Sequence, residues 1–282
     1  MEPASDRAKT NATAPVRIAA IQMVSAPDVP TNLAQAAHLL QQAASGGARL
    51  AALPEFFPLM GLRDTDKVAV RERPGSGPIQ EFLSTTARRL GLWIIGGSVP
   101  LEASVPDKVR NSCLVYDDQG RLAARYDKMH LFGYDNGRER YVESNTIEPG
   151  RDVVVVESPF GRMGLSICYD LRFPELYRRM GSVTLIMVPS AFTATTGEAH
   201  WETLLRARAI ENLAYELAPA QGGVHASGRR TYGHSMIVGP WGEVLARVPT
   251  GPGVVLADLD LQRIAAVRAS LPALEHRTLG PI

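Results

Sequence analysis

The regular alternation of short apolar segments and amphipathic segments along the chain constrains its fold more than any other feature. Residues 16–23 (VRIAAIQM) are long enough and apolar enough for a buried strand. Residues 32–45 then repeat apolar side chains at helical spacing and end at two glycines, and an apolar strand follows at residues 50–53. A strand, a helix and another strand in this order predict an α/β layered domain.

The alternation continues over the rest of the sequence. Helices are predicted at residues 79–90 and 199–215, and a further helix at Pro174, because proline is favoured in a first helical turn. Residues 131–148 are polar and irregular, which predicts a surface loop. Further strands are predicted at residues 92–95, 112–116, 122–127, 153–157, 162–167, 184–188, 235–238 and 254–259.

Composition and charge narrow the class of protein. The 282 residues are 45% hydrophobic, and their formal net charge of +1 gives no global field that would attract nucleic acid or an anionic membrane. No apolar run reaches the roughly 18 residues of a membrane span. Residues 1–15 are small and polar, so we expect a loose tail there and a single domain over residues 16–282. Two cysteines, Cys113 and Cys168, form no disulfide framework, which favours a reducing, cytoplasmic setting.

Cys168 stands where a predicted strand meets the start of a predicted helix. Ligands of α/β folds usually bind at this edge of a sheet. Backbone N–H groups at the start of a helix can stabilise an oxyanion, and the same positive end would favour the thiolate of Cys168. The alternative is a buried apolar cysteine without a chemical role, which is our interpretation of Cys113, inside an alternating strand.

Glu55 and Lys128 also follow predicted strands. Glu55 precedes two phenylalanines, and partial desolvation there would raise its pKa toward that of a general base. Lys128 directly follows the strand at residues 122–127, and His130 lies two residues further, which would place both side chains on one face. Each of the two charged side chains could instead be a solvated residue at a strand end.

Three segments around these residues resemble, in the same order, the catalytic signatures of the nitrilase-like carbon–nitrogen hydrolases. They are residues 53–57 (LPEFF), 127–131 (DKMHL) and 166–175 (SICYDLRFPE), and the similarity extends from about residue 16 to residue 277. The resemblance implies an α-β-β-α sandwich and subunits that pair into a homodimer or a higher oligomer.

The resemblance also assigns roles to individual residues. It implies that Cys168 is the nucleophile, Glu55 the general base and Lys128 the group that stabilises the tetrahedral intermediate. Glu143 matches a second acid of the family, which orients the lysine, and the backbone N–H of Tyr169 would complete the oxyanion hole. Such an amidase needs no cofactor, and the six histidines show no spacing that is typical of a metal site.

The substrate is predicted less directly. Segments flanking the three signatures look like the branch that acts on deaminated glutathione, a 2-oxo ω-amide that yields 2-oxoglutarate and cysteinylglycine. The related ω-amidase branch, which releases ammonia from 2-oxoglutaramate, stays an alternative. Arg172 is a candidate for holding a substrate carboxylate, with a structural ion pair as the alternative. His130 and Thr195 are expected to contact the substrate. Contacts with the leaving group are expected in residues 132–145 and 192–200.

Other classes of protein remain open at this point. One is an N-carbamoyl amino-acid amidohydrolase of the same superfamily, which a substrate panel would separate. A catalytically silent binding protein on the same scaffold is a second, and the presence of Glu55, Lys128 and Cys168 argues against it. A third is a papain-like hydrolase, in which Cys168 would pair with a histidine base.

Overall fold

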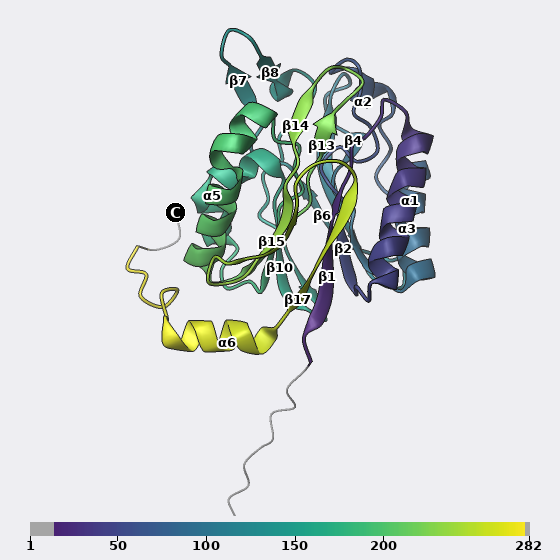
Figure 1. The fold of residues 1–282 in the computed structure, drawn as a ribbon. Helices are drawn as coiled ribbons and strands as arrows, with labels where there is room; N and C mark the ends of the chain where they lie inside the picture. Colours follow the sequence, from purple (N-terminus) through teal and green to yellow (C-terminus); the bar gives the residue numbers. More distant parts are fainter. Residues whose placement is uncertain (1–13, 280–282) are drawn as a thin grey trace, which may run out of the picture.

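The computed structural model describes residues 14–279 of the chain, so the predicted tail lies outside the described residues except for its last two positions. Two β-sheets pack face to face, and helices cover the outer face of each (Figure 1). Helices α1 (Val29–Ser45) and α3 (Pro78–Leu90) lie over one sheet, and α5 (Ala194–Asn212) lies over the other. This arrangement confirms the predicted α-β-β-α sandwich.

The first sheet has seven strands, in the order β17-β1-β2-β3-β5-β4, with β6 paired to β5. Strands β1, β2 and β3 are parallel, and the strands at both edges are antiparallel to their neighbours. Their bounds are β1 (Val16–Gln22), β2 (Leu50–Ala52), β3 (Trp93–Ile95), β4 (Val99–Glu102), β5 (Val109–Tyr116), β6 (Leu122–Asp127) and β17 (Gly253–Leu259).

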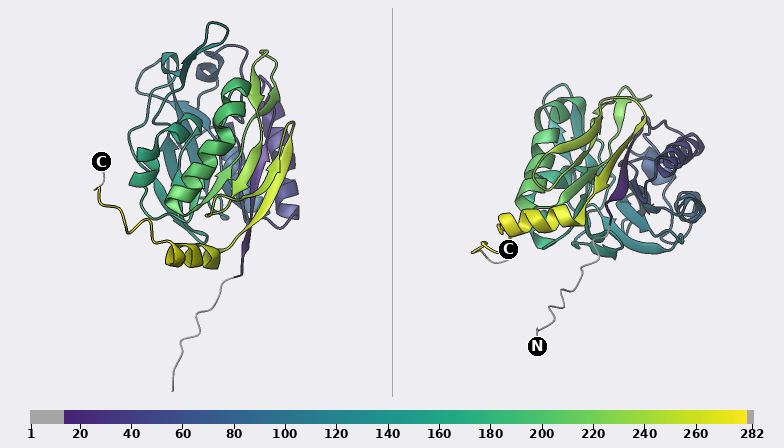
Figure 2. Two further views of the ribbon diagram at one scale, coloured as in Figure 1. Left: turned by 60° about the vertical axis from the view of Figure 1, so that its left-hand side comes forward. Right: turned by 60° about the horizontal axis from the view of Figure 1, so that its bottom comes forward.

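The second sheet has six strands, in the order β16-β15-β12-β11-β10-β9. Its central strands β10, β11 and β12 are parallel. The bounds are β9 (Val155–Ser158), β10 (Gly161–Leu165), β11 (Leu185–Met187), β12 (Tyr215–Ala218), β15 (Ser235–Val238) and β16 (Val244–Val248). Helix α6 (Leu261–Ser270) lies at the lower end of this half of the molecule, as the views in Figure 2 show.

Strand β1 shows why the sequence has apolar runs rather than alternating ones. Ile18 and Ala20 face the core between the two sheets, while Ala19 and Ile21 pack in the second core, under α1 and α3. All four side chains are therefore buried, as expected for a parallel strand that is covered on both faces.

Two sequence predictions about local structure were wrong. Residues 131–148 are not an irregular loop, because they contain the hairpin of β7 (Gly133–Asp135) and β8 (Arg140–Val142) and a 3₁₀ turn at Glu143–Asn145. The helix predicted at residues 199–215 begins earlier, at Ala194, where the Thr193 side chain caps it. It ends at Asn212, and Leu213 follows in the left-handed region with φ 46°.

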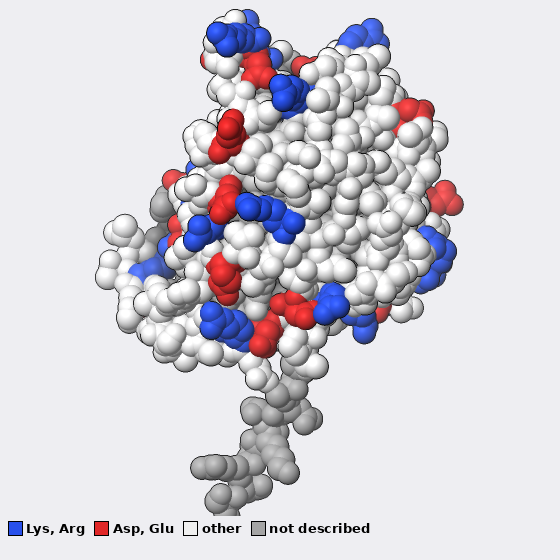
Figure 3. Space-filling model, in the orientation of Figure 1, with Lys and Arg blue, Asp and Glu red and all other residues white. Residues whose placement is uncertain are grey.

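The remaining short elements surround the end of the sandwich where β7 and β8 lie (Figure 1). They are α2 (Asp66–Ala69), α4 (Pro174–Arg179), a 3₁₀ turn at Cys168–Arg172, β13 (Gly222–Val224) and β14 (Arg230–Tyr232). Among residues 14–279, no helix is long and apolar enough to cross a membrane. Basic and acidic side chains are interspersed on the face shown in Figure 3.

Candidate active site

Three strands deliver the predicted catalytic residues to one site. Glu55 lies three residues after the end of β2, Lys128 directly follows β6, and Cys168 lies three residues after the end of β10. Because β2 belongs to the first sheet and β10 to the second, the site forms where the two sheets meet. The carboxyl ends of parallel strands are the usual place for ligands in α/β folds.

Lys128 is a buried ion-pair residue and not a solvated lysine at a strand end. Its side chain is 0% exposed, and its Nζ lies 2.8 Å from Oε1 of Glu55 and 2.8 and 3.0 Å from the two oxygens of Glu143. Burial disfavours the charged form, but the two carboxylates outweigh it and raise the pKa of Lys128. The ammonium therefore stays charged inside the protein.

Glu55 is 1% exposed and held at several atoms. Its Oε1 accepts hydrogen bonds from Lys128 and, at 3.0 Å, from Nδ2 of Asn111, while its carbonyl oxygen accepts one from Gln221. Burial raises the pKa of Glu55, although Lys128 opposes the shift. Glu143 accepts from Lys128 with both of its carboxylate oxygens, whereas Glu55 accepts from Lys128 with only one. Glu55 is therefore the carboxylate that can exchange a proton with the least loss of ion pairing.

Cys168 sits on a strained turn. Its φ of 51° lies in the left-handed region, which is uncommon for a residue with a β-carbon and occurs often at functional sites. Phe56, the residue after Glu55, shares this feature with φ 55°. The N–H of Cys168 donates to the Pro189 carbonyl at 2.9 Å, whereas the N–H of Tyr169 has no acceptor within residues 14–279.

The expectation that the helix start favours a thiolate on Cys168 was wrong. Burial, followed by the charge of Glu55, raises the pKa of the Cys168 thiol well above its usual value. The turn at Cys168–Arg172 is too short for a strong helix dipole, and Lys128 opposes the shift only in part. At rest the site therefore holds a neutral thiol next to a base.

Asp170 fixes the turn that carries Cys168, and sequence reasoning missed it. Its carboxylate accepts hydrogen bonds from the Ile167 N–H at 2.8 Å and from the Tyr126 hydroxyl at 2.7 Å. It also accepts one from the N–H of His130 at 3.0 Å. These bonds tie the turn after β10 to the end of β6, so that Cys168 and Lys128 keep their relative positions.

The Cys168 thiol opens into a small cavity of about 10 Å³, which we call the inner pocket. Cys168, Glu55 and Glu143 line it together with the aromatic and polar side chains of Phe132, Tyr169, Arg172, Phe192, Thr193, Thr196 and Arg229. The guanidinium of Arg172 lies over the rings of Tyr169 and Phe192, at 5.8 and 5.4 Å from their centroids. The inner pocket thus holds the thiol of Cys168 and the carboxylates of Glu55 and Glu143, and the Lys128 ammonium binds both carboxylates from behind its wall.

Comparison with known proteins decides the family. The model of the carbon–nitrogen hydrolase family matches residues 17–269. This chain belongs to the carbon–nitrogen hydrolase family. The predicted membership and the enzyme class that it carries are confirmed.

Curated relatives and solved structures agree with this assignment. The deaminated glutathione amidase of Yersinia enterocolitica is 40% identical over 264 residues, which cover 92% of each chain. Omega-amidase NIT2 of Xenopus tropicalis is 38% identical, over 93% of this chain and 94% of the relative. The crystal structure of Nit3 of Saccharomyces cerevisiae, a branch 10 member of the nitrilase superfamily, is 28% identical. It aligns with a TM-score of 0.84 over 95% of this chain and 98% of that one.

Two of the predicted substrate contacts lie elsewhere in this carbon–nitrogen hydrolase. His130 does not line the inner pocket, because β6 ends at Asp127 and the alternation of its side chains does not continue to residue 130. The ring of His130 stacks on Phe173, and its Nδ1 lies 2.7 Å from Asp170. Thr195 is exposed and donates to Glu139 at 3.1 Å. It stands in the first turn of α5, where the next residue, Thr196, points about 100° away and lines the inner pocket.

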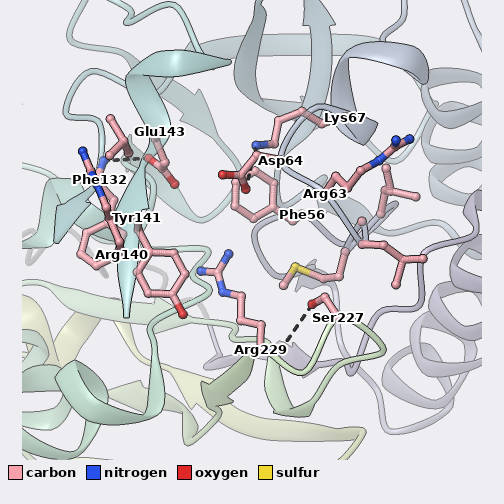
Figure 4. Close-up of a pocket in the computed structure, with 15 residues that line it drawn as sticks. Phe56, Arg63, Asp64, Lys67, Phe132, Arg140, Tyr141, Glu143, Ser227 and Arg229 are labelled. Carbon is pink, nitrogen blue, oxygen red and sulfur yellow. Dashed lines mark hydrogen bonds and ion pairs between the residues drawn. The ribbon is translucent and has the colours of Figure 1, made fainter. Parts of the chain in front are cut away.

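A second cavity of about 290 Å³ adjoins the inner pocket of the carbon–nitrogen hydrolase and opens to solvent (Figure 4). We call it the outer pocket. Phe132, Glu143 and Arg229 line both cavities and so form the wall between them. The far side of the outer pocket comes from the segment between β2 and α2 and from α2 itself, which carries Lys67, a residue that the sequence did not single out.

Proposed function

We propose that this carbon–nitrogen hydrolase cleaves the amide bond of a small 2-oxo ω-amide through a thioester on Cys168, with deaminated glutathione as the preferred substrate. The observation that carries the proposal is the contact of Lys128 with both Glu55 and Glu143 on the wall of the pocket that holds the Cys168 thiol. This set supplies a nucleophile, a base and a fixed positive charge next to one another in the interior of the protein.

In the first half of the reaction, Glu55 takes the proton of the Cys168 thiol as the sulfur attacks the amide carbon. Because burial raises the pKa of the thiol, the attack needs a base that accepts its proton, and Glu55 is next to it in the inner pocket. The oxyanion forms between Nζ of Lys128 and the N–H of Tyr169, which has no other acceptor in the described residues. The intermediate then collapses, and the protonated Glu55 gives its proton to the departing amine.

In the second half, a water molecule enters the space that the amine has left. Glu55 removes a proton from this water as its oxygen attacks the thioester carbon, and Lys128 again holds the oxyanion. Breaking the carbon–sulfur bond releases the carboxylic acid, and the proton on Glu55 returns to Cys168. Glu143 takes no proton in this scheme, because its role is to hold the Lys128 ammonium in place.

The choice of deaminated glutathione over 2-oxoglutaramate rests on two observations. The more similar of the two relatives described above, from Yersinia enterocolitica, carries that name, whereas the ω-amidase relative is the second candidate. The outer pocket also provides space next to the thiol for a leaving group larger than ammonia. Arg172, in the inner pocket, is our candidate for the 2-oxo carboxylate, which both substrates share.

The test measures kcat/KM for deaminated glutathione, 2-oxoglutaramate and an N-carbamoyl amino acid on one enzyme preparation. We expect the highest value for deaminated glutathione, since binding energy of the remote dipeptide can lower the barrier. A higher value for 2-oxoglutaramate would assign the protein to ω-amidase chemistry. The thioester is tested by quenching the reaction at saturating substrate and analysing Cys168 by mass spectrometry. The absence of an acyl adduct on Cys168 would count against the thioester.

A homodimer in the cytoplasm completes the proposal. Trp241, Ile210 and Leu245 are large apolar side chains that are exposed in the single chain, and Gly242, which follows Trp241, lies against Ile210. Exposed apolar side chains of this kind are suited to contact with a second copy. Light scattering on the wild type and on Trp241→Ser tests the dimer.

Cytoplasmic location suits a cysteine that must stay reduced, and fractionation of cells tests it.

A further inference from the structure

Of the four basic side chains that line the outer pocket, Lys67 and Arg229 are the two that are not mostly exposed, and no step of the proposed reaction uses them. Lys67 comes from α2, and Arg229 from the segment before β14. In Figure 4, Lys67 reaches into the cavity from above and Arg229 from below, and Glu143 and Tyr141 border the cavity on the left. Lys67 and Arg229 are separated by more than 160 positions in the sequence, so only the fold brings them to one cavity.

Arg229 is held in place by contacts other than an ion pair. Its Nη2 donates to the Ala191 carbonyl at 2.9 Å, and its guanidinium lies 5.1 Å from the centre of the Tyr141 ring, while no carboxylate among residues 14–279 pairs with it. Its Nε is buried and has no hydrogen-bond partner in the described part of the chain. Leaving such a donor unpaired costs free energy that a suitable acceptor would recover. The group is therefore oriented and still able to bind an anion.

Lys67 is also oriented by its contacts and still able to bind an anion. Its side chain is 15% exposed, and its Nζ donates to Oγ1 of Thr146 at 3.1 Å, with Asp64 at the long distance of 3.9 Å. Burial lowers the pKa of Lys67, and the charges of Arg229 and Lys128 add to this effect, while Asp64 and Glu143 oppose it. A carboxylate between Lys67 and Arg229 would remove this electrostatic conflict.

The other charged groups at the outer pocket do not cancel the charge of Lys67 and Arg229. Of the two acids that line it, Glu143 is bound to Lys128 with both oxygens, and Asp64 is largely exposed. Arg63 and Arg140 also line the cavity, but they are mostly exposed and lie near Asp66 and Asp135, respectively. The inner end of the pocket is therefore positive and partly shielded from water, where an ion pair is stronger than at the surface.

We infer that Lys67 and Arg229 bind the carboxylate at the far end of the leaving group, so that the outer pocket selects amides whose amine carries a carboxylate about two residues from the scissile nitrogen. This inference rests on the proposed function. A dipeptide spans at most roughly 7 Å, so its carboxylate must be bound in a cavity next to the one that holds the thiol. Arg229 lines both cavities and thus stands on the path between them.

Two substrates that differ only in this carboxylate test the inference. One is deaminated glutathione, and the other is the same molecule with glycinamide in place of glycine. We expect the wild type to have a kcat/KM roughly 10- to 100-fold higher for the acid, the range of a hydrogen bond to a charged group. Lys67→Met and Arg229→Met should each reduce this preference roughly tenfold, and hydrolysis of the amide substrate reports that the variant is folded and active.

Arg63→Met is the matched control, because it removes one positive charge from the same pocket but from a side chain near Asp66. It should keep the wild-type preference for the acid. Equal values for acid and amide in the wild type, or a full preference in both Lys67→Met and Arg229→Met, would overturn the carboxylate site. A wild type that prefers 2-oxoglutaramate to both dipeptide substrates would instead overturn the proposed function, so the two failures are distinguishable.

Discussion

Glu55 and Glu216 are two glutamates that the fold buries almost completely, at 1% and 0% exposure, in very different surroundings. Glu55 accepts hydrogen bonds from Lys128 and Asn111. Neither carboxyl oxygen of Glu216, on β12, has a hydrogen-bond partner in the described part of the chain. The nearby Arg208 is already engaged with the Leu171 carbonyl.

Burial raises the pKa of both carboxyl groups, but the partners decide what each can do. Lys128 and Asn111 stabilise the ionised form of Glu55, so that this group can hold and release a proton. Glu216 has only the more distant charge of Arg208 to oppose burial, which raises its pKa well above the usual value. We therefore expect Glu216 to be a neutral carboxylic acid at neutral pH, without a part in catalysis.

Lys128→Met should have the largest combined effect on stability and activity, because it removes the cation that is hydrogen-bonded to Glu55 and so makes Glu55 resemble Glu216. Breaking a buried ion pair typically costs about 3–5 kcal/mol of unfolding free energy, and losing one oxyanion donor costs a factor of about 100 or more in kcat. Urea denaturation and kcat/KM measure the two losses. Adding Glu55→Gln should recover part of the stability, and a double variant that is less stable than Lys128→Met would contradict the pairing.

Glu55→Gln should reduce kcat/KM by about 1,000-fold, within the range of general acid–base catalysis, with little loss of stability. Glu216→Gln is the matched control, since it changes an equally buried glutamate in the same way and should keep wild-type activity. In the wild type, kcat/KM should fall as pH drops through a pKa above the 4.5 of an ordinary glutamate, because protonated Glu55 cannot accept the thiol proton. If both variants lose activity equally, the distinction between the two glutamates fails.

The two cysteines extend the comparison to nucleophiles. Cys113 is 0% exposed inside β5, and burial raises its pKa to about 12, whereas Cys168 is 7% exposed and faces Glu55 in the inner pocket. Iodoacetamide should label Cys168 at least about 100-fold faster, since Cys113 reacts only when a core strand opens, at a cost of several kcal/mol. Peptide mass spectrometry over time gives both rates, and equal rates would show that the inner pocket does not activate its thiol.

The smallest expected effect is on stability at Glu216. The folded state keeps the Glu216 proton to a higher pH than the unfolded state, which loses it near the usual value of 4.5. The unfolded state then binds fewer protons, so stability falls as pH rises above that value. Glu216→Gln should therefore gain stability relative to the wild type as the pH is raised from about 5 to about 8. Urea denaturation at both pH values measures this, and a constant difference would show that Glu216 is ionised in the fold.

The sequence by itself determined the layered α/β architecture and the segments that carry Glu55, Lys128 and Cys168. Both kinds of information are local: strands and helices follow from spacing along the chain, and each catalytic residue directly follows, or nearly follows, its own strand. Local patterns also misled where tertiary packing decides orientation. His130 does not continue the alternation of β6, and Thr195 lies within a helix that begins five residues earlier than its pattern suggests.

Only the tertiary structure decided which groups meet. Asn111 supports the site from β5, and Asp170 from within residues 166–175, where the sequence did not reveal its hydrogen bonds to other parts of the chain. Lys67 and Arg229 meet in the outer pocket although more than 160 positions separate them. In the sequence, Glu216 resembles any charged residue of a strand. Only the folded structure shows that it is buried. The physical reason is that pKa values and ion pairs depend on distances and burial across the fold, which no periodicity along the chain encodes.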